Sequence, residues 1–230
     1  MGLKEDLTNE LSEIFRARWE ERNGSVVPED SDVKLSNDGV NLEGAVLYAD
    51  MADSTKLVEV KSKTFAAEIY KTFLRCAAKI IISEGGAVTA YDGDRVMAVF
   101  LGDSKNTSAV RAALKIHWAV ENILTPAMKS VYKDGDYVPK HVVGIDSSKL
   151  FAARTGVRGA NDLVWVGTAA NYAAKLAGLP HSYRTYITAG VYKSMHESVR
   201  LSQGVPMWVA LTWNFNNSTI YGSTYWWPID

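Results

Sequence analysis

The sequence has little cysteine, no marked excess of either charge and no long apolar run, and each shortage excludes a class of protein. Among its 230 residues there is one cysteine, Cys76, so an internal disulfide is excluded and a reducing compartment is expected. The formal net charge of −1 argues against a general affinity for nucleic acid or an anionic membrane. A membrane-spanning helix needs an apolar run of about 18 residues, and the chain has none. These absences predict a cytoplasmic protein that needs neither nucleic acid nor a membrane.

The composition is that of a globular protein, with 47% hydrophobic and 22% charged residues. The length suits one sizeable domain. We divide the chain into an N-terminal arm, residues 1–43, and a body, residues 44–230. Helical spacing of apolar residues predicts an amphipathic helix from Leu3 to Trp19, ending near Asn23. The polar stretch over 25–43 is interpreted as a connection to the body.

The body alternates strand and helix patterns in an order typical of an α+β, ferredoxin-like (split βαβ) fold. The predicted elements are a strand over 45–49, a helix over 65–81, a hairpin of strands 87–91 and 95–101, a helix over 107–124, and strands over 141–146 and 150–155. A helix over 168–178, a strand over 185–188 and a last hairpin of 207–215 with 218–221, turning at 216–217, complete it. The aromatic residues of the tail are interpreted as sheet packing rather than ligand stacking.

Two acidic residues stand where strands of the predicted sheet end. Asp50 follows the first strand, and Asp94 lies at the tip of the first hairpin. Because these strands can lie side by side, the two carboxylates can face each other. Paired carboxylates without cysteine or histidine suit Mg²⁺ or Mn²⁺. Taken singly, each aspartate is equally typical of a helix cap or a turn, and that interpretation stays open.

The segment after Asp50 leads into a helix, and Ser54 and Thr55 offer hydroxyls that can cap it. Free N–H groups from Met51 to Thr55, including those of Ala52 and Asp53, would bind phosphate oxygens. Metal-binding carboxylates beside a phosphate-binding helix end are typical of phosphoryl transfer.

Three segments resemble the motifs of one family. They read VLYADMADST over 46–55, AYDGDRVMAVF over 90–100 and VGTAANYAAKL over 166–176. In this order they resemble the first metal-binding motif, the Gly-Asp hairpin and the transition-state helix of class III adenylyl and guanylyl cyclases. The resemblance covers roughly residues 44–195. It implies an enzyme that closes a nucleoside triphosphate into a 3′,5′-cyclic monophosphate and releases diphosphate.

The resemblance also implies roles for single residues. Asp50, the Met51 carbonyl and Asp94 would hold two Mg²⁺ or Mn²⁺ ions, and Asn171 would orient the ribose. Lys175 stands where the family usually has an arginine that stabilises charge on the α-phosphoryl group. Lysine is a point charge without the planar fork of arginine, and it is equally typical of a solvated helix face. In this family the two sets of residues come from different protomers, which implies a homodimer with two sites.

Two positions depart from the purine cyclases. These usually carry a lysine three residues before the hairpin glycine and an aspartate three residues before the glycine of the helix motif, where this chain has Ala90 and Val164. The chain therefore lacks the usual purine readers. Tyr91 and Arg95 are candidates to contact a smaller pyrimidine base, although Tyr91 also fits strand core. A purine cyclase with other base contacts, and a silent regulatory domain, both remain open.

Further features resemble the stand-alone pyrimidine cyclases of bacterial Pycsar antiphage systems. These are the short N-terminal helix, ADMADST over 49–55, YDGDR over 91–95 and NDLVWVG over 161–167. The resemblance implies CTP or UTP as the substrate, cyclic CMP or cyclic UMP as the product, and a neighbouring effector that senses the product. The sequence does not separate the two pyrimidines.

The residue that binds the β- and γ-phosphates is a separate question. Many family members place a lysine near the C-terminus on these groups, but no lysine follows Lys193 here. Arg184, Lys193 and Arg200 are the candidates to replace it.

Overall fold

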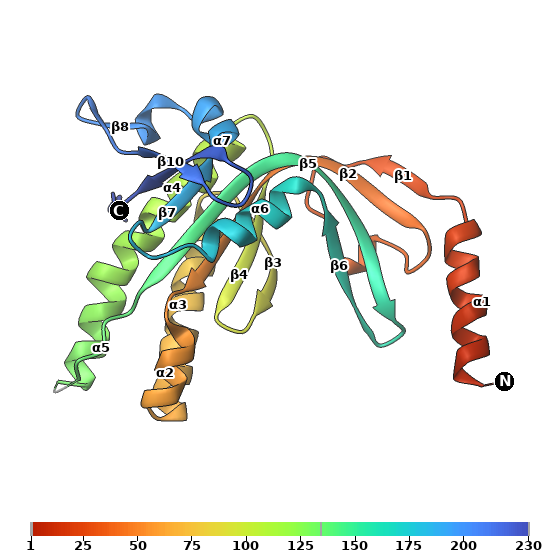
Figure 1. Ribbon diagram of the computed structural model, residues 1–230, viewed down its shortest axis with the longest axis horizontal. Helices are drawn as coiled ribbons and strands as arrows, with labels where there is room; N and C mark the ends of the chain where they lie inside the picture. The colour runs from red at the N-terminus through yellow and green to blue at the C-terminus, as the bar shows by residue number, and fades with distance from the viewer. Residues whose placement is uncertain (1, 134, 230) are drawn as a thin grey trace.

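The computed structural model describes residues 2–133 and 135–229 and has an α+β architecture with helices on both faces of a central sheet (Figure 1). The helices are α1 (Leu3–Arg16), α2 (Ser54–Val60), α3 (Lys63–Ser83), α4 (Lys105–Ala119), α5 (Thr125–Val131), α6 (Thr168–Ala177) and α7 (Ala189–Ser194). A π-helical turn, Val120–Leu124, joins α4 to α5, and 3₁₀ turns cover Asp30–Asp32 and Glu197–Val199. Among the helices of the described residues, none combines the length and apolar character that a membrane span requires.

The central sheet has the order β10-β11-β7-β5-β2-β4-β3, with β1 paired to β2 and β6 paired to β5. Its strands are β1 (Glu20–Asn23), β2 (Asp38–Met51), β3 (Ala87–Asp92), β4 (Arg95–Phe100), β5 (His141–Val157), β6 (Ala160–Val166), β7 (Thr185–Thr188), β10 (Val209–Trp213) and β11 (Ser218–Ser223). A small separate pair consists of β8 (Leu201–Ser202) and β9 (Val205–Pro206). The first strand and the hairpin strand are neighbours, as the sequence predicts, because β2 pairs antiparallel with β4.

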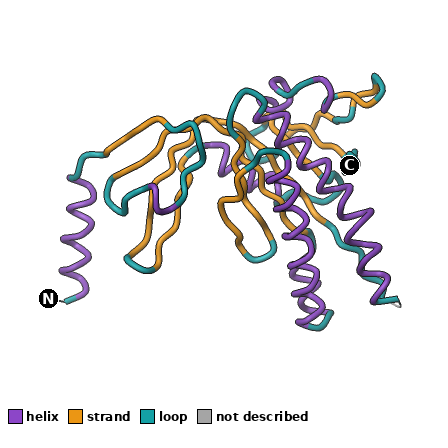
Figure 2. The backbone as a smooth tube through the Cα atoms, turned by 180° about the vertical axis from the view of Figure 1, so that it is seen from behind, coloured by secondary structure: helices purple, strands orange, loops and turns teal. Residues whose placement is uncertain are grey.

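Alternate residues of β2 face opposite sides of the sheet, and each side has its own helices. Leu47 and Ala49 pack in the core under α3 and α4, whereas Val46 packs with α6. Figure 2 shows α3 and α4 together on one face, and Figure 1 shows α6 crossing the other. Gly144 of β5 lets α6 approach closely, since an added Cβ would lie 2.2 Å from the Ala173 carbonyl oxygen.

Most of the predicted elements of the body are confirmed. The helix over 168–178 is α6, the strand over 185–188 is β7, and the last hairpin is β10 with β11. Asn217 has a positive φ of 56°, which explains why an asparagine stands in that turn. The packing interpretation of the aromatic tail is confirmed for two residues, because Trp208 and Trp213 are buried. The helix over 107–124 continues through the π-helical turn into α5.

The N-terminal region differs from its prediction. The first helix ends at Arg16 rather than near Asn23, and residues 20–23 form a strand parallel to residues 38–41. This strand carries exposed polar side chains, so its hydrophobic pattern gives no sign of it; backbone pairing with β2 stabilises it. Strand β2 begins at Asp38, not Ala45, so the expected boundary between residues 43 and 44 falls inside it.

The two strands predicted over 141–146 and 150–155 are one continuous strand, β5. It pairs with β2 from the His141–Met51 pair to the Ala153–Gly39 pair, which keeps it unbroken through the polar residues between. The far half of β5 also pairs with β6, a strand that the sequence did not predict. Together with β1 and the first half of β2, these strands form the projecting part of the molecule on the right of Figure 1.

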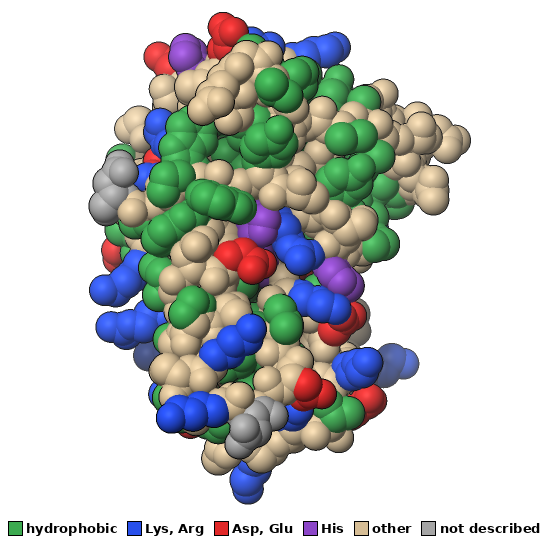
Figure 3. Space-filling model, turned by 90° about the vertical axis from the view of Figure 1, so that its left-hand side faces the viewer, with side chains coloured by type: hydrophobic (Ala, Val, Ile, Leu, Met, Phe, Trp, Pro, Cys, Tyr) green, Lys and Arg blue, Asp and Glu red, His purple; other side chains and the backbone are tan. Residues whose placement is uncertain are grey.

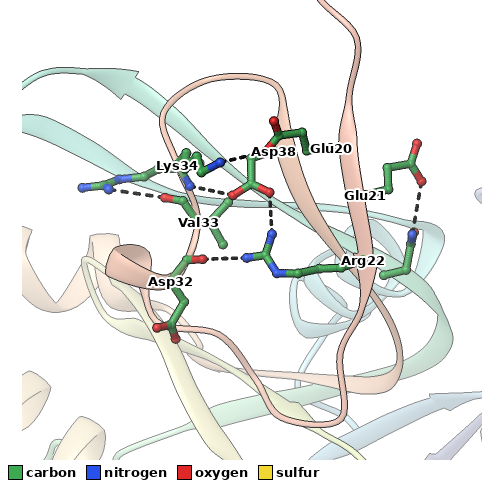
Figure 4. Close-up of polar contacts among 9 residues, drawn as sticks. Glu20, Glu21, Arg22, Asp32, Val33, Lys34 and Asp38 are labelled. Atoms are coloured by element: carbon green, nitrogen blue, oxygen red, sulfur yellow. Dashed lines mark hydrogen bonds and ion pairs between the residues drawn. The ribbon is translucent and has the colours of Figure 1, made fainter.

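A polar network holds this projecting part together (Figure 4). Arg22 of β1 forms an ion pair with Asp38 of β2 and donates to the Asp32 carbonyl at 2.6 Å. The backbone N–H of Lys34 donates to the buried Asp38 carboxylate at 2.8 Å, and together with Arg22 it holds the pKa of that carboxyl below its usual value. Helix α1 lies beyond this network and has no buried residue.

The face seen in Figure 3 carries basic and acidic side chains interspersed, with apolar side chains gathered toward the upper half. This pattern agrees with the near-neutral charge of the chain.

Candidate active site

Asp50 and Asp94 lie at the same end of the sheet. Asp50 is the last residue but one of β2 and stands in register with Arg95, the first residue of β4. Asp94 immediately precedes Arg95 in the turn of the hairpin, where Gly93 has a φ of 62° that favours glycine. The ladder between β2 and β4 therefore places the two carboxylates next to each other, as the sequence predicts.

The electrostatics of this pair leave negative charge without compensation. Burial, together with the neighbouring charge of Asp94, raises the pKa of Asp50 to about 6, although the charge of Arg95 opposes that rise. The Oδ2 atom of Asp94 is buried and has no hydrogen-bond partner among the described residues. A buried carboxylate oxygen without a donor is costly unless a cation binds it.

These residues fit a hard divalent cation. Among the described residues, no three His, Cys, Asp or Glu side chains are placed to hold a metal ion together. A metal here would therefore take its ligands from two carboxylates, backbone oxygen and substrate. Mg²⁺ is often bound in this way, through one or two carboxylates plus phosphate oxygens. The donor set is all oxygen, which suits Mg²⁺ or Mn²⁺ rather than a softer metal.

The loop after Asp50 turns the chain from β2 into α2 within two residues. The Ala52 N–H donates to the Lys140 carbonyl at 2.9 Å, and Asp53 has a positive φ of 60°. Helix α2 then begins at Ser54, and the Leu57 N–H is the first to bond back, to the Asp53 carbonyl at 3.1 Å. The N–H groups before Leu57 lie in the first helical turn, where a helix leaves its donors free.

The expected side-chain cap of this helix is wrong. Asp53 is the N-cap residue, and no side-chain hydrogen bond caps α2, so the hydroxyls of Ser54 and Thr55 do not have that role. Both residues already lie inside the helix because the left-handed turn at Asp53 is complete before them. A serine cap occurs one helix later, where Ser62 accepts from the Phe65 N–H at 3.2 Å.

The candidates for base contact lie on different faces of the sheet. Arg95 is opposite Asp50 and bonds to Asp92 at 2.5 Å, so both residues are on the Asp50 side. Ala90 pairs with Met97 and faces the same side, packed with the α6 cluster. Tyr91 pairs with Val96, whose side chain packs under α3, so Tyr91 faces away from Asp50.

Tyr48 lies on the Asp50 side and was not singled out from the sequence. It stands two residues before Asp50 on β2, so both side chains face the same way. Arg95, which pairs with Asp50, is the diagonal neighbour of Tyr48 on β4. Burial raises the pKa of the Tyr48 hydroxyl, and the charge of Arg95 opposes that rise. The two-residue spacing from Asp50 was the available signal.

The residues of the helix motif form a second, exposed group. Asn171 and Lys175 lie one turn apart on α6, and the Lys175 Nζ stands 4.5 Å from the centre of the Phe215 ring. Among the described residues, no hydrogen bond or ion pair joins either one to Asp50 or Asp94. Val164 lies on β6, 40% exposed and paired with Ala153. Among the described residues of one chain, the two groups of predicted site residues are therefore not joined by a hydrogen bond or an ion pair.

No family model matches the chain. Curated relatives match it over its full length. The chain is 55% identical to a uridylate cyclase of Xanthomonas perforans and 49% identical to one of Burkholderia cepacia, with 100% of each chain covered. A uridylate cyclase of Rhodovulum sp. (strain MB263) is 36% identical, with 98% of each chain covered.

Solved structures share the fold. The guanylyl cyclase Cya2 superposes with a TM-score of 0.69 at 13% identity, over 82% of this chain and 95% of that one. The adenylyl cyclase CyaB from P. aeruginosa gives 0.66 at 17% identity, over 80% and 95%. This chain belongs to the class III nucleotidyl cyclases. The predicted fold class and family are therefore confirmed, and class III cyclases generally use divalent metals.

Proposed function

We propose that this nucleotidyl cyclase converts UTP to 3′,5′-cyclic UMP and diphosphate. The observation that carries the proposal is the identity of 55% over the full length to a uridylate cyclase. The chain itself supports a pyrimidine, because Ala90 and Val164 offer no polar side chain at the positions where purine cyclases read the base.

The chemistry of the base favours uracil over cytosine. The guanidinium of Arg95 only donates hydrogen bonds, and the O4 carbonyl of uracil accepts them, whereas the amino group of cytosine at that position donates. Arg95 faces the Asp50 side of the sheet with Tyr48 beside it. We assign these two residues to the base, in place of the expected wall formed by Tyr91, which faces the other side.

The reaction is divided between the two groups of residues. Asp50, Asp94 and the Met51 carbonyl would hold two divalent cations, and the loop of Ala52, Asp53, Ser54 and Thr55 would bind phosphate oxygens through its N–H groups. The bound cations supply acidity to the ribose 3′-hydroxyl and neutralise the triphosphate. Asn171 orients the ribose, and Lys175 stabilises the charge that develops on the α-phosphoryl group.

These two groups meet when a second copy supplies α6. Asn171 and Lys175 are exposed, and among the described residues neither forms a hydrogen bond or an ion pair with the carboxylates. A homodimer with twofold symmetry would bring the α6 of each copy to the carboxylates of the other and complete two equivalent sites.

The test is incubation of the purified protein with Mn²⁺ and each of UTP, CTP, GTP and ATP separately, with the products resolved by mass spectrometry. The proposal expects cyclic UMP from UTP as the dominant product. Cyclic CMP as the dominant product would show that the substrate is CTP rather than UTP. A purine product, or no product at all, would refute the assignment as a pyrimidine cyclase.

We further propose that the cyclic nucleotide is a cytoplasmic second messenger in antiphage defence. The likeness to the Pycsar cyclases supports this role. Cells carrying the gene with its neighbours should accumulate cyclic UMP after phage infection and survive better than cells carrying the Asp50→Ala variant. Equal survival of the two strains would refute the role without affecting the assignment of the reaction.

A further inference from the structure

A cavity of about 530 Å³ opens beside the phosphate-binding loop. One wall is the loop and α2, and the other is the segment 136–140, which leads into β5. Three lysines line it, Lys56, Lys61 and Lys140. The candidates Arg184, Lys193 and Arg200 are not among its lining residues, and the Arg184 guanidinium already bonds to the His181 carbonyl.

Tyr137 lines this cavity and carries a hydroxyl group that has no hydrogen-bond partner among the described residues. Its Oη atom is buried. The ring is fixed by edge-on packing against Phe65, with 5.6 Å between ring centres. Burial, with smaller contributions from Tyr70, Asp53 and Asp94, raises the pKa of Tyr137 to about 12. Tyr137 and Asp53 of the phosphate loop line the same cavity, so a ligand bound there can reach both the loop and this ring.

Lys140 connects the same segment to the loop. Its carbonyl accepts from the Ala52 N–H at 2.9 Å, and its ammonium lies 3.3 Å from the Asp53 carboxylate. The side chain is 37% exposed, so the ammonium can exchange this partner for another anion. Lys61, in contrast, is paired with Asp136 at 2.7 Å, at the end of α2 away from the loop.

We propose that Tyr137 and Lys140 bind the β- and γ-phosphates of the nucleoside triphosphate. This inference rests on the proposed function and adds residues to the same site. The phenol donates one hydrogen bond and the ammonium donates up to three, and polyphosphate oxygens only accept. Such charge-assisted hydrogen bonds are stronger than neutral ones. The pair supplies the contacts that a lysine near the C-terminus makes in many class III cyclases and that this chain lacks.

The test uses three variants of the full chain. Lys140→Ala removes the ammonium, Tyr137→Phe removes the hydroxyl but keeps the packed ring, and Lys61→Ala is a control that removes a lysine of the same cavity already held by Asp136. Calorimetry measures the Kd of inorganic tripolyphosphate with Mg²⁺, and separately the Kd of cyclic UMP, which has no β- or γ-phosphate. Melting temperatures show whether each variant is folded.

The expected result is a selective loss of polyphosphate affinity. The Kd of tripolyphosphate should rise about tenfold in Lys140→Ala and about three- to tenfold in Tyr137→Phe, while that of cyclic UMP stays within about twofold. Lys61→Ala should change neither by more than about twofold. In turnover assays with UTP, both test variants should raise KM more than they lower kcat.

An unchanged tripolyphosphate Kd in both test variants would overturn the inference. An equal loss of affinity for tripolyphosphate and cyclic UMP would also overturn it, because the residues would then only hold the loop in place. If the parent protein cyclises UTP while either of these results is found, the proposed function stands and the inference fails. If the parent binds tripolyphosphate through these residues but forms no cyclic product, the proposed function fails instead.

Discussion

The carboxylate end of the sheet and the exposed face of α6 are built in different ways. Asp50 and Asp94 are partly buried, and the β2–β4 ladder fixes their position. Their charges raise the cost of burial and leave a carboxylate oxygen without a partner. Asn171 and Lys175 lie on a helix that is anchored by its alanine face and presents these two side chains outward.

The difference teaches which contacts each group needs. Burial of the two carboxylates carries an electrostatic cost in a single chain, and a bound cation would lower that cost. The two polar side chains of α6 are exposed to solvent, and under the proposed function they would act on substrate bound by a second copy. Substitutions at the first group should therefore affect chemistry, cation binding and stability, whereas substitutions at the second should affect chemistry alone.

The largest expected effect is at the carboxylates. Asp50→Ala or Asp94→Ala should lower kcat by about a thousandfold or more, since the loss of a bound cation removes several kcal/mol of transition-state stabilisation. Steady-state formation of cyclic UMP measures it. Asp103→Ala, in an exposed loop after β4, is the control and should retain parental turnover. Near-normal turnover in either site variant would show that the carboxylates do not hold catalytic metal.

A smaller loss is expected on α6. Lys175→Ala should lower kcat about a hundredfold with little change in KM, because the ammonium acts on charge that develops in the transition state. Lys175→Arg should retain most of the activity, since arginine is the usual residue of the family at this position. Lys79→Ala, on the exposed face of α3, is the matched control. An unchanged kcat in Lys175→Ala would remove this residue from the mechanism.

Selectivity for the base should depend on Arg95 and not on Tyr91. Arg95→Ala should reduce the preference for UTP over CTP, measured as a ratio of kcat/KM values, by about tenfold because the donor to the O4 carbonyl is lost. Tyr91→Ala should leave the ratio unchanged, since this side chain is 58% exposed on the opposite face of the sheet. A selectivity change in Tyr91→Ala but not in Arg95→Ala would reverse this assignment.

The smallest expected effect is on stability. It distinguishes the carboxylates from the α6 residues in an experiment that needs no enzymatic activity. The folded pKa of Asp50 is about 6, above its ordinary value of 3.8, so the folded state binds this proton more tightly. That stabilisation is present below about pH 4 and is lost as the pH rises through about 6. At pH 8 the free energy of unfolding of Asp50→Asn should therefore be about 1 to 3 kcal/mol larger than that of the metal-free parent. At pH 4 the variant should show no such gain.

Thermal unfolding without divalent metal measures this difference. The control is Lys175→Gln, on the exposed helix face, whose stability relative to the parent should be the same at pH 4 and pH 8. An Asp50→Asn variant no more stable than the parent at pH 8 would show that the carboxylate is not buried at a cost.

The sequence was informative wherever a local pattern decided the structure. The hairpin around Gly93, the amphipathic α3 and the turn before Ser218 carry their signals within a few residues, and all three are confirmed. The pairing of β2 with β4, which places Asp50 beside Asp94, followed from fold class alone.

Features fixed by distant pairing were missed. Strand β1 is polar and exposed and exists because residues 38–41 lie beside it, and β5 runs through polar residues because β2 supports it. Tyr137 and Lys140 had no motif around them, and their proposed role depends on the close approach of their segment to the loop after Asp50. The face of Tyr91 depended on strand register, which a single residue slip reverses.

The most direct test of the shared site is to mix Asp50→Ala and Lys175→Ala chains after verified subunit exchange and to measure cyclic UMP formation. Each mixed dimer would carry one site with both substitutions and one intact site. Random exchange at equal concentrations therefore predicts about a quarter of the parental turnover, far above either variant alone. Activity no higher than the sum of the separate variants would contradict a site assembled from two copies.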